Sequence, residues 1–186
     1  MFVRTERLFL RPAWPEDRDD IVEALTGDDI QCTLGMAPLP DSVGEVGDYL
    51  ARPHDPRLPH FFMYLRAPGG PKLVGSIGLG VYEGDVEVGY WIASLYKGRG
   101  FAGEGLRAMV EQARSLGHRR MVASHFGDAP GVHQVLECAG FHDSGQVRSR
   151  YSAGRAMEHA ARIYVAELER RASHRADTRS SASNAA

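Results

Sequence analysis

The chain has 186 residues, enough for one domain with a sizeable core and too few for two. Its composition is that of an ordinary globular domain, and the formal net charge of −2 excludes a general attraction to nucleic acid or to an anionic membrane. The N-terminal stretch "MFVRTERLFLRPAW" carries charges and resembles neither a signal peptide nor a membrane span. We therefore expect a cytoplasmic protein with no nucleic-acid or membrane partner.

The N-terminal quarter predicts a strand, a helix and a long loop. Alternation toward Leu8 and Leu10 predicts one strand, which Pro12 ends. Acidic residues after Pro15 and an apolar stripe behind them predict a helix. Residues 27–58 are rich in glycine, proline and aspartate, which is typical of a binding loop, with one short helix expected near 42–51.

The middle of the chain predicts three strands followed by a helix. β-Branched and aromatic residues between short turns predict antiparallel strands over 60–67, 71–82 and 85–93. Apolar residues at helical spacing then predict a helix that begins near Ala102 and that Gly117 ends.

The last third predicts a strand, a short helix and two final strands, over residues 119–126, 130–141, 145–151 and 156–166. From Glu169 onward large apolar residues are almost absent, which predicts a disordered polar tail over 169–186. The order of elements predicts a single mixed α/β (α+β) domain over residues 1–168, with an antiparallel meander ahead of one crossover helix.

Cysteine and histidine give no sign of a metal or disulfide framework. Cys32 and Cys138 lie far apart and in no metal-ligand spacing, so we expect two buried free thiols. No spacing among the eight histidines suggests a metal site, and none is expected.

The stretch "KGRGFAGEG" spells G-x-G-x-x-G at Gly98, Gly100 and Gly103. A dinucleotide site would place this motif in the first turn of a parallel βαβ unit, whereas here three antiparallel strands precede it. Glycines that open a helix, with Lys97 and Arg99 beside them, are instead suited to hold another anion, such as a pyrophosphate. The alternative is a glycine-rich connector that binds nothing.

Three stretches in this order resemble the GCN5-related N-acetyltransferases (GNAT). They are "TERLFLRPAWPEDRDDIVEAL", "VEVGYWIASLYKGRGFAGEGLRAMVEQA" and "GVHQVLECAGF". The similarity covers roughly residues 4–166 and is strongest to the branch of ribosomal-protein N-terminal acetyltransferases (RimJ/RimL type). It implies a central, mostly antiparallel sheet that is splayed at the cofactor strand and flanked by helices.

The resemblance also implies a coenzyme A site. The family's pyrophosphate loop corresponds to Lys97, Gly100 and Ala102, and the pantetheine arm would pair with the strand that precedes this loop. The residues expected to bind acetyl-CoA are Tyr90, Trp91, Ile92, Lys97, Gly98, Arg99, Gly100, Phe101, Ala102 and Gly103.

Transfer of an acetyl group to an amine requires a base that removes the amine proton. Glu87 is the expected base because it lies on the cofactor strand, a few residues before the expected thioester position. Its alternatives are an exposed carboxylate or an ion-pair partner of an arginine, and Glu83 and Asp85 are close enough in sequence to replace it.

The chain departs from the family at three polar positions. The resemblance predicts Asn and Ser at two of them, where this chain has Ala129 and Val132. At the third, some relatives have a Tyr that acts as the general acid, and this chain has Leu136. A general acid must therefore come from elsewhere or be absent, and the three fallback candidates are His125, His133 and Tyr151.

The function expected from the resemblance is direct acetyl transfer from acetyl-CoA to a primary amine, either a protein N-terminus or a small molecule. Aromatic residues in "HFFMYL" and Trp14 could line the acceptor pocket, and loops 27–58 and 149–157 should shape it. The alternatives are a non-catalytic acyl-CoA-binding module and, far behind, a dinucleotide-dependent oxidoreductase. The expected partner is the amine acceptor, and the expected assembly is a monomer or a homodimer.

Overall fold

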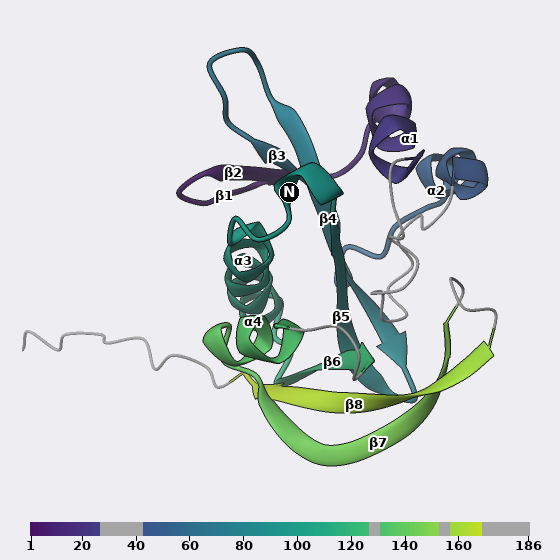
Figure 1. The fold of residues 1–186 in the computed structure, drawn as a ribbon, viewed down its shortest axis with the longest axis vertical. Helices are drawn as coiled ribbons and strands as arrows, with labels where there is room; N and C mark the ends of the chain where they lie inside the picture. Colours follow the sequence, from purple (N-terminus) through teal and green to yellow (C-terminus); the bar gives the residue numbers. More distant parts are fainter. Residues whose placement is uncertain (27–42, 127–130, 153–156, 169–186) are drawn as a thin grey trace, which may run out of the picture.

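The computed structural model describes residues 1–26, 43–126, 131–152 and 157–168. These residues form an open eight-stranded sheet with helices on both faces (Figure 1). The strand order is β1-β2-β3-β4-β5-β6-β8-β7. The strands are β1 (Val3–Arg4), β2 (Leu8–Arg11), β3 (His60–Leu65), β4 (Lys72–Tyr82), β5 (Asp85–Ile92), β6 (Arg120–Phe126), β7 (His142–Ser152) and β8 (Met157–Glu167).

Two helices cover each face of the sheet. α3 (Phe101–Ser115) and α4 (Val132–Cys138) lie on one side of the central strands, and α1 (Arg18–Thr26) and α2 (Val46–Ala51) lie on the other (Figure 1). Short 3-10 turns precede α1, α2 and α3, over Pro15–Asp17, Val43–Glu45 and Ser94–Tyr96. Apart from the N-terminal strand, the predicted order of strands and helices is confirmed for the described residues.

The N-terminal stretch that predicted one strand forms a two-stranded hairpin instead. Val3 pairs with Leu10 and Arg4 with Phe9, so β1 folds back on β2. The turn between them is held by Thr5, whose main-chain N–H donates to the carbonyl of Leu8 at 3.0 Å. Alternation continues through such a turn, and therefore the sequence pattern alone did not separate the two strands.

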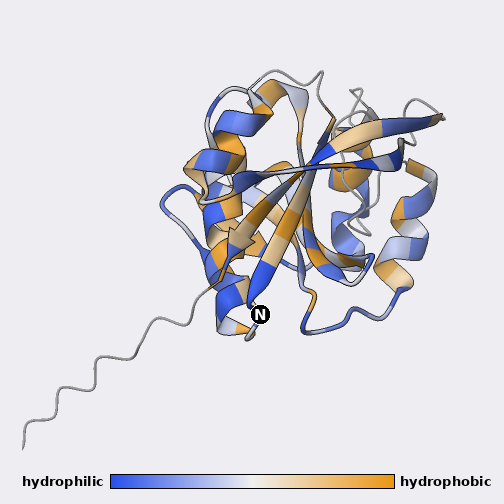
Figure 2. Ribbon diagram, turned by 90° about the horizontal axis from the view of Figure 1, so that it is seen from below, coloured by the Kyte–Doolittle hydropathy of each residue, from blue (hydrophilic) through white to orange (hydrophobic). Residues whose placement is uncertain are grey.

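The sheet packs a hydrophobic layer against each pair of helices. Under α3 and α4 the core contains Ile77, Leu106 and Met109, and under α1 and α2 it contains Ile21 and Phe62, all fully buried. Hydrophobic and hydrophilic residues alternate along helices and strands in Figure 2, as a two-faced sheet between amphipathic helices requires.

Neighbouring strands are antiparallel everywhere except between β5 and β6. These two strands run parallel and share a single register pair, Glu87 with Val122. Along the rest of β5, residues 88–92 have no strand partner on that side among the described residues. The expected splay beside the cofactor strand is therefore present.

Of the two cysteines, only Cys138 lies among the described residues. Cys138 is exposed on α4, so the expectation that it is buried is wrong, because α4 turns that face away from the sheet. Cys32 and the expected tail over 169–186 lie outside the described residues. Among the helices that the structure describes, none has the length and hydropathy needed to cross a bilayer.

Candidate functional site

The predicted glycine loop forms the N-terminal entry of α3. Gly98 and Gly100 have φ of 73° and 80°, a left-handed conformation that glycine adopts without steric cost. Gly100 is the N-cap of α3 and provides no side chain to satisfy the first helical N–H groups. These donors and the positive end of the helix dipole together suit an anion.

A cavity of about 540 Å³ opens between this loop, the end of β5 and α4. Nine of the ten residues expected to bind the cofactor line it: Tyr90, Trp91, Ile92, Lys97, Gly98, Gly100, Phe101, Ala102 and Gly103. The remaining one, Arg99, does not line the cavity, and its guanidinium lies 5.7 Å from the ring centroid of Tyr96. The structure thus brings two separate predicted stretches, the strand end and the loop, around one space.

Four further residues line the same cavity and were not expected from the sequence: Tyr96, Gly131, Val132 and Val135. Tyr96 belongs to the connection between strand and loop, and the others come from α4 and its N-cap. Val132 was noted only as a departure from the family, although an apolar residue at that helical position does indicate a surface that faces another element.

The strand side of the cavity is largely apolar. Burial raises the pKa of Tyr90 to about 12, which reflects the low polarity around its hydroxyl. The indole of Trp91 packs in the core on the α1/α2 side of the sheet, and its buried Nε1 has no hydrogen-bond partner among the described residues. Since β5 has no strand partner here among the described residues, its main-chain groups can accept a ligand that pairs as an added strand.

Glu87, the expected base, lies outside the cavity lining in a buried ion pair. The exposed fractions of the Glu87 and Arg150 side chains are 1% and 2%. Arg150 Nη2 lies 2.9 Å from Glu87 Oε1, and Nη1 lies 3.1 Å from Oε2. Ser124 Oγ also donates to Oε1, and the guanidinium of Arg150 lies 3.3 Å from the ring centroid of Tyr82.

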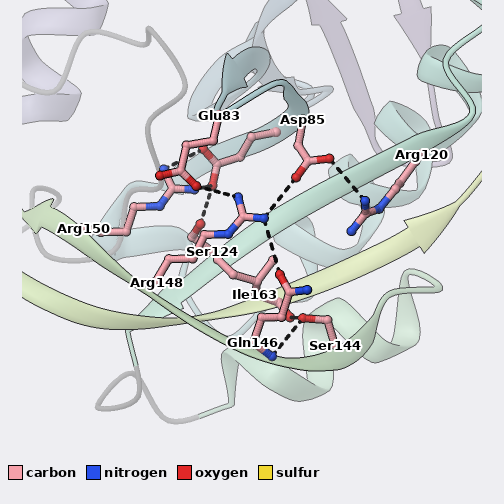
Figure 3. Close-up of polar contacts among 10 residues, drawn as sticks. Glu83, Asp85, Arg120, Ser124, Ser144, Gln146, Arg148, Arg150 and Ile163 are labelled. Atoms are coloured by element: carbon pink, nitrogen blue, oxygen red, sulfur yellow. Dashed lines mark hydrogen bonds and ion pairs between the residues drawn. The ribbon is translucent and has the colours of Figure 1, made fainter.

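The two acids that could replace Glu87 also pair with arginines (Figure 3). Arg148 Nη1 lies 3.1 Å from Glu83 Oε2, and Arg148 Nη2 lies 3.3 Å from Asp85 Oδ2. Arg120 Nη1 lies 3.4 Å from Asp85 Oδ1. These contacts join the β4–β5 turn to β6 and β7. Glu83 and Asp85 therefore belong to a network beside the Glu87 pair.

The fallback acids are dispersed. His133 is exposed on α4, and His125 is buried in β6 with its ring tilted against Tyr164. Leu136, at the family's Tyr position, is 1% exposed and part of the core. The side chain of Tyr151 and residue Ala129 lie outside what the structure describes. Within the described ranges, no group of three or more His, Cys, Asp or Glu is arranged to hold a metal ion.

Comparison with known proteins decides the family. The family described as "Acetyltransferase (GNAT) domain" matches residues 7–142, which is most of the chain. The chain belongs to the GNAT acetyltransferase family. The comparison with curated proteins found no match.

Solved GNAT structures share the fold of this chain at low sequence identity. A GNAT-family acetyltransferase from Bacillus anthracis is 21% identical with a TM-score of 0.70, covering 90% of this chain and 99% of its own. RimL, a ribosomal L7/L12 acetyltransferase in complex with coenzyme A, is 14% identical with a TM-score of 0.70 and coverages of 92% and 100%. Mycobacterium smegmatis RimJ, in complex with CoA-disulfide, is 19% identical with a TM-score of 0.65 and coverages of 86% and 81%.

These findings confirm the family and the GNAT fold expected from the sequence, and the presence of RimL and RimJ among the neighbours agrees with the expected branch. The roles of individual residues in this chain, including Glu87 and the loop, stay predictions.

Proposed function

We propose that this GNAT protein transfers an acetyl group from acetyl-CoA directly to a primary amine, on a protein N-terminus or a small molecule. One observation carries the proposal: a single cavity joins a glycine-rich helix N-terminus to the unpaired side of β5. Neighbours with the same fold contain coenzyme A in RimL and acetyl-CoA in the microcin C7 self-immunity acetyltransferase MccE.

The residues present fit such a ligand at both ends. N–H groups at the start of α3, together with Lys97, would hold the pyrophosphate. Main-chain groups of β5 near Trp91 and Ile92 would pair with the amides of the pantetheine arm. Bound acetyl-CoA would supply the activated acetyl group as a thioester.

We assign the removal of the amine proton to Glu87. Each carboxylate oxygen can accept two hydrogen bonds. Oε1 accepts from Arg150 and Ser124, whereas Oε2 accepts only from Arg150 among the described residues. Oε2 therefore keeps acceptor capacity for a water molecule, through which the proton would pass, because Glu87 is buried and does not line the cavity.

A second candidate function is a non-catalytic acyl-CoA-binding module. It is favoured by the apolar Val132 in the cavity and by the core position of Leu136, where some relatives would have polar groups. The ion pair between Glu87 and Arg150 also favours this candidate, because a structural role in the pair is enough to explain a carboxylate at position 87.

Ligand-dependent unfolding tests the shared part of the two candidates. Acetyl-CoA at 100 times its dissociation constant should stabilise the protein by about 2.7 kcal/mol, and NAD should not. The absence of any shift with coenzyme A esters would contradict both candidates. Release of the free thiol in the presence of a panel of primary amines then separates them, since only an acetyltransferase releases thiol in an amine-dependent way.

The loop assignment has its own test with a matched control. Gly100→Ala places a Cβ at a φ of 80° in the cavity loop, and Gly84→Ala does so at 87° in the β4–β5 turn. Both should be strained to a similar extent, by about 1 kcal/mol. Only the Gly100 variant should bind acetyl-CoA less tightly, and equal binding by the two variants would refute the assignment.

A further inference from the structure

Arg7 connects the N-terminal hairpin to the cavity loop and to α3. Its Nη1 donates to the main-chain carbonyl of Arg99 at 2.9 Å, and its Nε donates to Glu104 Oε2 at 2.7 Å. The guanidinium also lies 4.5 Å from the ring centroid of Phe101, the first residue of α3. One side chain thus contacts both the loop and the first turn of the helix.

The bond to the Arg99 carbonyl has a consequence for the next N–H group. In a trans peptide the carbonyl oxygen and the following N–H point in opposite directions, and no cis peptide occurs among the described residues. Holding the Arg99 carbonyl toward Arg7 therefore turns the N–H of Gly100 away from Arg7. Gly100, on one side of this peptide, has a φ of 80° and adopts it without steric cost, so the hydrogen bond from Arg7 adds a restraint that the glycine itself does not supply.

The guanidinium of Arg7 lies close to Gly100 of the cavity loop. A Cβ built on Gly100 would lie 3.4 Å from Arg7 Nη2, an ordinary van der Waals contact, so the guanidinium lies on the side of Gly100 from which a Cβ would project. Gly100 lines the cavity and Arg7 does not. Arg7 is therefore placed to orient the loop rather than to contact a ligand in the cavity.

Arg7 also compensates the charge of the Glu104 carboxylate in the first turn of α3. This carboxylate, on a residue that is 7% exposed, accepts hydrogen bonds from Thr5 Oγ1, from the main-chain N–H of Arg7 and from Arg7 Nε. Burial acts to raise the pKa of Glu104, but these hydrogen bonds outweigh it and keep the pKa below its usual value. An ionised acid thus stands in the first turn of α3, where it would repel a bound phosphate if Arg7 did not compensate its charge.

We infer that Arg7 is a positioning residue for the cofactor's pyrophosphate: it turns the Gly100 N–H toward the cavity and compensates the negative charge of Glu104. The inference rests on the proposed function, since it concerns the loop expected to bind coenzyme A. It adds a residue from the N-terminal hairpin that does not line the cavity.

Binding of coenzyme A, measured by isothermal titration calorimetry, tests the inference. Arg7→Met should weaken binding by about tenfold or more, since a charge-assisted hydrogen bond and a charge compensation are both lost. Arg66→Met is the matched control. Arg66 is exposed and donates to the carbonyls of Thr5 and Glu6 in the same hairpin, with no described contact to the loop.

Pantetheine, which lacks the pyrophosphate, separates positioning from general damage. Titrations followed by nuclear magnetic resonance should give the Arg7→Met variant a pantetheine affinity within about twofold of the wild type. Equal losses for coenzyme A and pantetheine would overturn the inference, since they would indicate a disturbed fold. If Arg7→Met does not fold, Arg7→Lys decides by the same comparison, because it keeps the charge but loses the planar fork with which Arg7 reaches Arg99 through Nη1 and Glu104 through Nε.

The Arg7→Met/Glu104→Gln double variant divides the two effects. If charge compensation acted alone, removal of the acid would restore binding to the wild-type level and the orienting role would be overturned. If the Arg99 carbonyl must be held, the double variant stays weaker than Glu104→Gln alone. Failure of the wild type to bind coenzyme A would contradict the proposed function itself, whereas binding by the wild type with an unchanged Arg7→Met variant contradicts only this inference.

Discussion

Glu87 on β5 and Arg150 on β7 form a buried ion pair across two intervening strands, β6 and β8, of the sheet order. The β7 strand is strongly curved (Figure 1), and its register with β8 shifts between Asp143 and Val147. Ser124 on β6 completes the ion pair by donating to Glu87. The pair thus fastens the β7–β8 hairpin to the cofactor strand at the point where β5 and β6 separate.

Loss of one partner of this pair should destabilise the protein strongly. Arg150→Met leaves the carboxylate of Glu87 buried without its cation, and we expect a loss of about 3–5 kcal/mol in the free energy of unfolding. Urea unfolding of the variant and the wild type measures this loss in the free energy of unfolding. The Glu87→Gln/Arg150→Met double variant, which has no buried charge at this place, should be more stable than Arg150→Met; a double variant that is less stable would contradict a coupled pair.

Glu87→Gln should reduce turnover while coenzyme A affinity stays close to that of the wild type. Removal of a general base lowers the rate by about 10²–10⁴-fold, and Glu87 does not line the cavity. Thiol release and calorimetry should be compared at a temperature where urea titration shows the variant to be folded. Unchanged turnover in the folded variant would remove Glu87 as the base.

The features that could be predicted from the sequence are those formed by residues close together in the chain. The end of β5 and the glycine loop are close in the chain, and nine of the residues that the resemblance singled out there line one cavity, while their binding of the cofactor stays a prediction. The partners of Glu87 and Glu104 are 63 and 97 residues away, and hydrophobic periodicity carries no information about which distant strand crosses which. For the same reason Glu87 could be proposed as a base or as an ion-pair partner, but Arg150 could not be named.

Gly75→Ala should disrupt both the sheet and the cofactor strand. A Cβ on Gly75 would lie 2.1 Å from the main-chain oxygen of Trp91 and 3.1 Å from the Cα of Ile92, so the strands themselves would have to separate. We expect a loss of roughly 3 kcal/mol or more in the free energy of unfolding, with weaker coenzyme A binding. Gly69→Ala, whose Cβ would meet nothing within 4 Å, is the control and should change stability by less than about 0.5 kcal/mol. Similar stabilities of the two variants would contradict the close approach of β4 and β5.

His60 should make the folded protein less stable as the pH falls below neutrality. Its ring is buried at the start of β3, with Nε2 2.7 Å from the carbonyl of Leu79. Burial, helped by the nearby charges of His54 and Arg52, lowers the pKa of His60 in the folded state.

The sign of the effect follows from proton uptake. As the pH falls through about 6.5, the unfolded chain binds a proton that folded His60 still excludes, so the free energy of unfolding decreases until the lower folded pKa is reached. His60→Gln removes this difference, and its stability should decline less than that of the wild type between pH 7.5 and 5.5 in urea titrations. His133→Gln, which removes an exposed histidine from α4, is the control. A wild-type pH dependence in the His60 variant, or the same flattening in the control, would show that another group is responsible.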